Sequence, residues 1–385
     1  MDTSYILNHL GEEHGDYFNA IAPPIVQTSN FLFETVAELR KAFEDEYSGF
    51  LYSRGLNPTV EILRKKLAAL DGAEDCLVFN SGAAAIYASV MSVIKAGDHI
   101  VSVNAPYTWA TKLFVNTLPR FGVTHTFIDG TQPENWENAL QPNTTLFYLE
   151  SPNSWTYEIQ DLEAIAALAK RRGITTIIDN SYCTPIYQRP IEMGIDMSLQ
   201  SATKYIGGHS DTVAGVLTGR RAHMEKIFNE EYLTVGSGIQ PFNAWLLLRG
   251  LRTLPMRLEH ISKTTLAVVD WLKNHPLVEK VLFPFDETFT QYELARRQMS
   301  GACGLLTFML KHDNPAGIEA FCNRLKFIRM AVSWGGHESL IIPKVAGMKT
   351  EHFDPLNPLH RSCRLYVGLE EADFIIRDLE QAFTG

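Results

Sequence analysis

Lys204 and Asp179 are the two residues whose types and spacing point most directly to chemistry. Asp179 ends the apolar, strand-like run 175–179, and Lys204 closes a hydroxyl-rich turn 25 residues later. An amine can hold the aldehyde of pyridoxal phosphate (PLP), and an acid beside the pyridine nitrogen keeps the ring protonated so that it accepts electrons. Each residue alone also fits an ordinary surface position. Together, with the hydroxyls of Ser201 and Thr203 beside the lysine, they predict PLP as the cofactor.

A second segment, Asn80-Ser81-Gly82-Ala83, has the composition of a phosphate-binding loop. It follows an apolar run and precedes a predicted helix, and the first amides of a helix can bind a phosphate. Gly82 would let that phosphate approach closely. The alternative is a plain helix cap by Ser81 or Asn80.

Three other positions carry side chains that suit a cofactor or a substrate. Arg54, two residues after Tyr52, has the planar guanidinium that binds phosphate with two hydrogen bonds. Tyr107 follows an apolar run, and its ring could stack on the cofactor. Arg364 is a charge within a strand-like run and needs a partner, which is either a substrate carboxylate or an acid such as Glu370. The first two positions also fit an exposed arginine and a packed loop aromatic.

Composition excludes several classes of protein. The 385 residues carry a net charge of −10, which argues against a nucleic-acid groove and against binding to an anionic membrane. The five cysteines are widely spaced without a C-x-x-C motif, so we expect reduced thiols in the cytoplasm and no metal site. The first residues lack the basic and apolar regions of a secretion signal, and no apolar run is long enough to span a membrane.

The elements that must position these residues follow a regular pattern. Short apolar runs alternate with helix-length segments from 76 to 219, which predicts an α/β fold with a mostly parallel central sheet covered by helices on both faces. Ligands bind at the carboxyl ends of the strands in such sheets. The predicted strands are 76–79, 99–103, 124–128, 145–149, 175–179, 197–200 and 215–218, and the predicted helices include 83–95 and 161–172.

The sequence also predicts three parts. Residues 1–45 are mixed and contain Pro23-Pro24, which is typical of an extended N-terminal arm. Residues 46–240 form the PLP-binding α/β domain. From 241 to 385 the pattern changes to a smaller α+β domain that begins with a long helical stretch, 242–274, interrupted near Pro255.

Six motifs in a fixed order give the chain its resemblance to a family, the PLP enzymes of Cys/Met metabolism. This family includes cystathionine β-lyase, cystathionine γ-synthase, cystathionine γ-lyase and methionine γ-lyase. The resemblance extends from Ala22 to Glu370 and implies a PLP-dependent aminotransferase-like fold, known as fold type I. The motifs are Tyr-Ser-Arg-x-x-Asn-Pro-Thr (52–59), Ser-Gly (81–82), Glu-Ser-Pro (150–152), Asp-Asn (179–180), Ser-x-Thr-Lys-Tyr (201–205) and Arg-Leu-x-Val-Gly-Leu-Glu (364–370).

The resemblance implies a role for each candidate residue. Lys204 would carry PLP, Asp179 would face the ring nitrogen, and Tyr107 would stack on the ring and contact the substrate. These three are the expected catalytic residues. Four residues would bind the cofactor phosphate: Gly82, Ala83, Ser201 and Thr203.

The remaining implied roles concern the substrate and the assembly. Ser333 and Arg364 would hold the substrate carboxylate. Tyr52 and Arg54 would reach the phosphate of a neighbouring subunit, since the family usually forms a tetramer built from dimers that share their active sites. The implied partner is a small sulfur amino acid, with no nucleic acid and no membrane.

Three departures from the common pattern favour the β-lyase type. Ser154 occupies a position where many members have asparagine, Val332 stands where γ-type members often have glutamate, and Trp334 replaces a leucine. A γ-reaction must also move a proton at Cβ, which calls for more polar support than a β-elimination. The leading hypothesis is therefore cystathionine β-lyase, which converts L-cystathionine to homocysteine, pyruvate and ammonia.

Other functions stay open at this stage. The motif 52–59 looks more like the γ-type members, so cystathionine γ-synthase, cystathionine or methionine γ-lyase and O-acylhomoserine sulfhydrylase are alternatives. A non-catalytic homologue that binds PLP is a further alternative, and the presence of Lys204, Asp179 and Arg364 argues against it.

Overall fold

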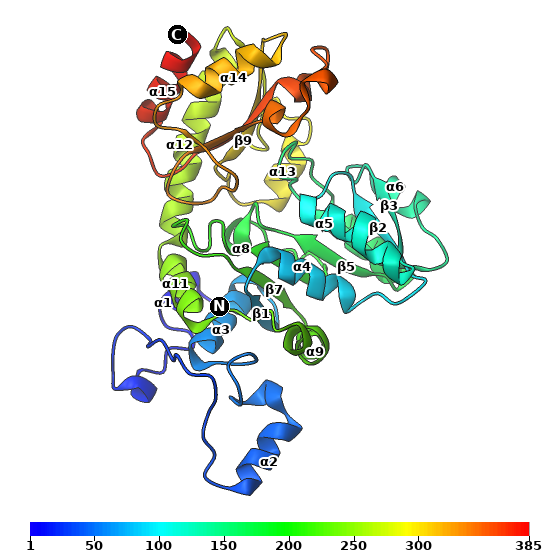
Figure 1. Ribbon diagram of the computed structural model, residues 1–385, viewed down its shortest axis with the longest axis vertical. Helices are drawn as coiled ribbons and strands as arrows, with labels where there is room; N and C mark the ends of the chain where they lie inside the picture. The colour runs from blue at the N-terminus through cyan, green and yellow to red at the C-terminus, as the bar shows by residue number, and fades with distance from the viewer. Residues whose placement is uncertain (385) are drawn as a thin grey trace. The chain divides into compact units, whose positions relative to one another are not determined.

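The computed structural model describes residues 1–384, and its internal contacts divide the chain into two compact units (Figure 1). Unit 1 comprises residues 1–151, 160–207 and 211–252. Unit 2 comprises residues 152–159, 208–210 and the chain from Thr253 onwards.

A seven-stranded sheet forms the centre of unit 1, with the order β1-β7-β6-β5-β4-β2-β3. In this sheet β7 alone runs antiparallel to the other strands, so the predicted mostly parallel sheet is confirmed. The strands are β1 (Asp75–Phe79), β2 (His99–Val103), β3 (Thr124–Ile128), β4 (Thr144–Glu150), β5 (Thr175–Asp179), β6 (Met197–Ser201) and β7 (Gly215–Gly219). Each predicted strand is present within one residue at either end.

Apolar side chains on both faces of this sheet explain why helices cover it twice. Tyr148 of β4 and Ile177 of β5 belong to a buried cluster with helix α4, whereas their neighbours Phe147 and Ile178 belong to a second cluster with α7. Successive side chains of a strand point to opposite faces, so the two clusters lie on the two sides of the sheet. The helices of unit 1 are α1 (Thr3–Asn8), α2 (Val36–Glu44), α3 (Pro58–Asp71), α4 (Gly82–Met91), α5 (Thr108–Lys112), α6 (Pro133–Asn138), α7 (Leu162–Arg172), α8 (Thr184–Tyr187), α9 (Arg221–Ile227), α10 (Leu233–Val235) and α11 (Pro241–Arg252).

Unit 2 is a smaller α+β body around a five-stranded sheet with the order β10-β11-β12-β9-β8. Its own apolar cluster joins α12, α14 and α15 to this sheet. The strands are β8 (Val278–Leu282), β9 (Leu305–Leu310), β10 (Arg329–Met330), β11 (Leu340–Pro343) and β12 (Ser362–Tyr366), and the helices are α12 (Leu254–Asn274), α13 (Tyr292–Gln298), α14 (Pro315–Arg324) and α15 (Ala372–Thr384).

The contact division differs from the predicted domain limits in two places. Helix α11 packs on α3, so residues 241–252 belong to unit 1. The long helical stretch is interrupted at Thr253, close to the predicted break near Pro255. Segment 152–159 joins unit 2 because the Tyr157 hydroxyl contacts Thr307 and the Ile159 amide donates to Gln291. The separate status of residues 1–45 as an arm stays a prediction.

The cysteines, the helix lengths and the metal-binding side chains bear on the class of protein. All five cysteines are buried, and none of them is part of a disulfide. Within residues 1–384 no helix has the length and apolar character needed to span a membrane, and no cluster of acidic, histidine and cysteine side chains is arranged to hold a metal.

A buried carboxyl group lies beneath the sheet of unit 1. Asp71, at the end of α3, accepts a hydrogen bond from the Thr218 hydroxyl of β7. Burial raises the pKa of Asp71 from its ordinary 3.8 to about 6. Since the folded chain binds this proton more tightly than the unfolded chain, the stabilising contribution is full below pH 3.8 and is lost as the pH rises through about 6.

Asp71→Asn is expected to flatten the pH dependence of stability, because the amide stays neutral at every pH. A shift of about two pKa units corresponds to about 3 kcal/mol of unfolding free energy. The gain in melting temperature over the unmodified chain should therefore be larger at about pH 8 than at about pH 5. An equal change at both pH values would contradict the assignment of this proton to Asp71.

Candidate active site

Asp179 lies at the carboxyl end of β5, beside Glu150 at the end of β4. Its carboxylate is buried and accepts a hydrogen bond from the Ser181 amide at 3.0 Å. Burial raises the pKa of Asp179, while the hydrogen bonds from Ser181 and the positive charge of Lys204 act in the opposite direction. Asp179 and Lys204 are therefore close enough to interact, as their predicted roles require.

Lys204 lies in a closed turn that directly follows β6. Its amide donates to the Ser201 carbonyl at 3.0 Å, and the Gly207 amide donates to the Ala202 carbonyl at 2.8 Å. The Thr203 hydroxyl donates a hydrogen bond to the Ala214 carbonyl. The same hydroxyl accepts a hydrogen bond from the Ala214 amide. These bonds fix the backbone on both sides of the lysine, so the point from which its side chain extends is set by the sheet.

The loop before α4 lies directly against this turn. Ser81 caps the helix by accepting a hydrogen bond from the Ala84 amide, which confirms the cap. A side chain at Gly82 would meet Ser201 at 3.2 Å, and one at Gly215 would come within 2.2 Å of the Ser81 carbonyl. Two glycines therefore bring the start of α4 against the ends of β6 and β7.

These contacts fit the needs of PLP. The amides of Gly82 and Ala83 are in the first turn of α4, where no intrahelical partner is available, and they lie near the hydroxyl of Ser201. Such a group of donors suits a phosphate dianion, while Lys204 and Asp179 suit the aldehyde and the ring nitrogen. Unit 1 thus has hydrogen-bond donors for the phosphate, an amine for the aldehyde and a carboxylate for the ring nitrogen of the cofactor.

Tyr107 lies immediately before α5, and its amide donates to the Glu150 carboxylate at 2.5 Å. Burial raises the pKa of the Tyr107 phenol, and the negative charges of Asp179 and Glu150 raise it further. The ring is 41% exposed, so it is available to a ligand. Glu150 was not predicted as a site residue, although its place in the Glu-Ser-Pro motif at a strand end was a usable signal.

Tyr52 and Arg54 lie in a different loop of unit 1. Tyr52 bridges to Asn30, and the Ser53 amide donates to the Ser29 carbonyl at 2.9 Å. The Arg54 guanidinium lies 5.5 Å from the centre of the Tyr52 ring. Both side chains are exposed, and their predicted contact with a neighbouring subunit stays a prediction.

Unit 2 contains the residues predicted to hold a carboxylate. Arg364, on β12, donates to the Ser154 carbonyl at 3.1 Å and lies 5.2 Å from the centre of the Trp155 ring. Ser333 has a φ of +85°, a left-handed conformation that is uncommon for a residue with a side chain and is often found at functional sites. Glu370, the alternative partner considered for Arg364, accepts hydrogen bonds from the amide and the hydroxyl of Ser339.

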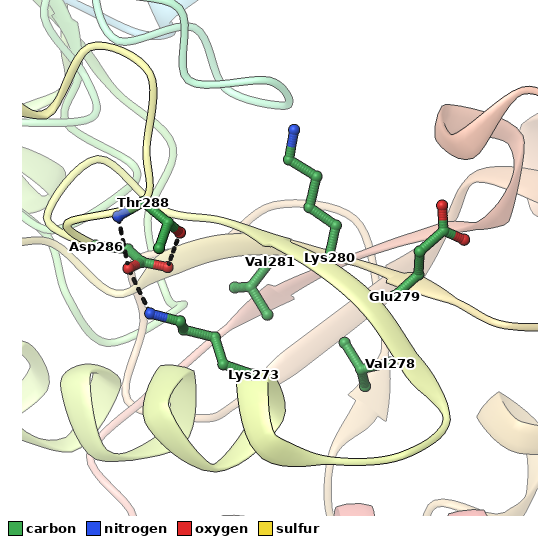
Figure 2. Close-up of a pocket in the computed structure, with 7 residues that line it drawn as sticks. All are labelled: Lys273, Val278, Glu279, Lys280, Val281, Asp286 and Thr288. Atoms are coloured by element: carbon green, nitrogen blue, oxygen red, sulfur yellow. Dashed lines mark hydrogen bonds and ion pairs between the residues drawn. The ribbon is translucent and has the colours of Figure 1, made fainter.

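A hollow of about 180 Å³ in unit 2 lies outside this set of residues (Figure 2). The Lys273 amine donates a hydrogen bond to the Asp286 carboxylate at 2.7 Å. The amide and the hydroxyl of Thr288 donate to the same carboxylate, as the dashed lines in Figure 2 show. None of the predicted site residues lines it, so it is not part of the candidate site. Its lining is Lys273, Val278, Glu279, Lys280, Val281, Asp286 and Thr288.

Comparison with known proteins gives one consistent family. A model of the family described as Cys/Met metabolism PLP-dependent enzyme matches residues 3–384. L-Methionine gamma-lyase of Treponema denticola is 37% identical over 97% of this chain and 94% of that protein. Cystathionine gamma-lyase of Macaca fascicularis is 35% identical over 97% of this chain and 91% of its own. The crystal structure of metB from Corynebacterium glutamicum matches with a TM-score of 0.91 and 31% identity, covering 100% of this chain and 98% of that one.

Proposed function

This chain belongs to the Cys/Met metabolism PLP-dependent enzymes, with the fold type I architecture and PLP as cofactor, and from this premise we propose that it cleaves L-cystathionine by β-elimination. The balanced reaction consumes one water molecule and releases homocysteine, pyruvate and ammonia. The bond broken is the one between Cβ and sulfur, and sulfur leaves with the bonding electrons and gains a proton.

We propose the following roles for the residues of unit 1. Bound PLP supplies the electron sink for the pair left behind when Cα loses its proton. Lys204 removes that proton with its amine, which extends from a backbone turn held beside the strand ends. Asp179 stays ionised next to the ring nitrogen, supported by the Ser181 amide. Gly82, Ala83, Ser201 and Thr203 bind the phosphate, and Tyr107 stacks on the ring.

We propose that Arg364 and Ser333 of unit 2 bind the α-carboxylate. A guanidinium suits a carboxylate because it donates two parallel hydrogen bonds. The contact of Arg364 with the Ser154 carbonyl and the Trp155 ring restrains the guanidinium before a ligand arrives. This restraint lowers the entropy lost on binding.

The single observation that carries β-elimination is the chemistry of the residues at the variable positions. Val332, Trp334 and Ser154 have no group that titrates near neutral pH, so none of them can move the second proton that a γ-reaction requires at Cβ. Val332 is 84% exposed, whereas Trp334 is only 6% exposed, so the tryptophan is packed within the protein and the valine is not.

Cleavage on the γ side of the substrate is the second candidate, favoured by similarity to proteins named as gamma-lyases. Steady-state rates with L-cystathionine, L-methionine and O-succinyl-L-homoserine plus cysteine test the choice of substrate, and the keto acid released from L-cystathionine tests which bond is cleaved. The proposal expects the highest kcat/KM with L-cystathionine. A higher value with methionine, or with the homoserine ester, would contradict it.

We also propose that the chain forms a homotetramer of dimers that share their sites. Support comes from apolar side chains on the N-terminal segment: Phe18 is 101% exposed, Leu32 is 98% exposed, and α2 buries no residue and projects from the rest of unit 1 (Figure 1). A second copy could cover these side chains. We further propose a cytoplasmic location, which is supported by five cysteines that form no disulfide. The homocysteine product would give the enzyme a role in methionine biosynthesis.

A further inference from the structure

Lys344 is a second cation beside Arg364 that the sequence did not single out. It follows β11, and its amine lies 4.6 Å from the centre of the Trp155 ring, whose other cationic neighbour is Arg364 at 5.2 Å. One indole ring in unit 2 therefore has two positive groups against it. Cations are attracted to the ring face, and this attraction holds both groups near one place.

The indole itself is firmly held. Its N–H donates to the Ser362 hydroxyl at 3.2 Å, and the Trp155 carbonyl accepts from the Thr307 hydroxyl at 2.9 Å. The Trp155 amide donates to the Asn153 side chain at 2.9 Å. Three bonds from three segments fix both the backbone and the ring, so the two cations are presented by a rigid support.

Burial and the neighbouring guanidinium both disfavour the charged form of the Lys344 amine. Burial lowers the pKa of the Lys344 amine, and the positive charge of Arg364 lowers it further. Within residues 1–384 no aspartate or glutamate forms an ion pair with Lys344. Half-buried charge without a partner destabilises a fold unless a ligand compensates it, which makes such a group a candidate for binding.

We propose that Lys344 is a specificity-determining residue that binds the second carboxylate of a dicarboxylate amino acid. L-Cystathionine carries a carboxylate at each end, whereas methionine has only the α-carboxylate. If Arg364 binds the α-carboxylate, the amine of Lys344 can bind the distal carboxylate. This inference rests on the proposed function for the role of Arg364 and adds the feature by which the substrate is selected.

The test measures binding to the PLP-loaded protein with two amino acids of equal length. L-2-Aminoheptanedioate ends in a carboxylate and L-2-aminoheptanoate ends in a methyl group, and neither has a leaving group at Cβ or Cγ. Isothermal titration calorimetry is expected to show that the unmodified protein binds the dicarboxylate about tenfold more tightly. Lys344→Met should remove most of that preference, and Lys344→Arg should restore part of it.

Lys349→Met is the matched control, because it removes an exposed lysine from the same unit and changes the net charge equally. It should keep the preference. An equal loss of affinity for both ligands in Lys344→Met would overturn the inference, as would no preference in the unmodified protein or no binding of either ligand. Because neither ligand can be cleaved, failure to release a keto acid from cystathionine would overturn the lyase proposal while leaving this preference measurable.

Discussion

Lys204→Ala is expected to abolish turnover and to remove covalently bound PLP from the protein. In the proposed mechanism the amine at this position both holds the aldehyde and moves the Cα proton, and loss of a general base alone costs about 10²–10⁴-fold in rate. Borohydride reduction followed by peptide mass spectrometry should place the PLP mass on the peptide with Lys204 in the unmodified protein and find none in the variant.

Lys170→Ala is the control for this experiment, since Lys170 is an exposed residue in the last turn of α7. It should retain both the modified peptide and the activity. Reduced PLP on any other lysine of the unmodified protein would contradict the assignment of Lys204.

Asp179→Asn is expected to keep the fold and lose about 10²–10³-fold in kcat. The amide oxygen can still accept the hydrogen bond from Ser181, so the strand end should stay intact. A neutral amide, however, cannot hold a proton on the ring nitrogen, and the electrons at Cα then lose their sink. Steady-state kinetics and a melting curve of the PLP-loaded variant measure both effects.

Glu163→Gln, on the exposed face of α7, controls for the loss of one negative charge from unit 1. Its kcat should match that of the unmodified chain. If Asp179→Asn also kept full kcat, the carboxylate would have no electronic role. If the variant failed to fold, the Asp179 carboxylate would be structural instead.

The fold was predictable where the sequence pattern is local. Strands buried on both faces appear as continuous apolar runs, and β2, β3 and β5 match their predicted limits. The short edge strand β10, with both residues exposed, has no such run, and β11 was missed with it. The grouping of segment 152–159 with unit 2 had no signal in the sequence, because its partners, such as Thr307, are far away along the chain.

The site was predictable to the same extent. Lys204, Ser201 and Thr203 are close in sequence, and Asp179 ends a strand, so the pattern alone locates them. The Glu150 carboxylate reaches the Tyr107 amide across a separation of 43 residues, and no local pattern predicts that bond. Lys344 was not predicted for the same reason, because only the folded structure brings it next to Trp155 and Arg364.

The choice between β and γ cleavage depends on few side chains. The relatives named as gamma-lyases share about a third of their residues with this chain, which is enough to fix the fold and the cofactor. Substrate choice is set by contacts that single substitutions change. We propose that Val332 and Trp334 are such positions, and that Lys344 adds a cation that a neutral thioether end would not use.

The identity of the keto acid released from L-cystathionine tests the central claim most directly. The PLP-loaded protein is incubated with the substrate, and the products are separated and identified by mass spectrometry. β-Elimination predicts pyruvate together with homocysteine. Release of 2-oxobutyrate together with cysteine would contradict β-elimination and assign this chain to the γ-cleaving members of its family.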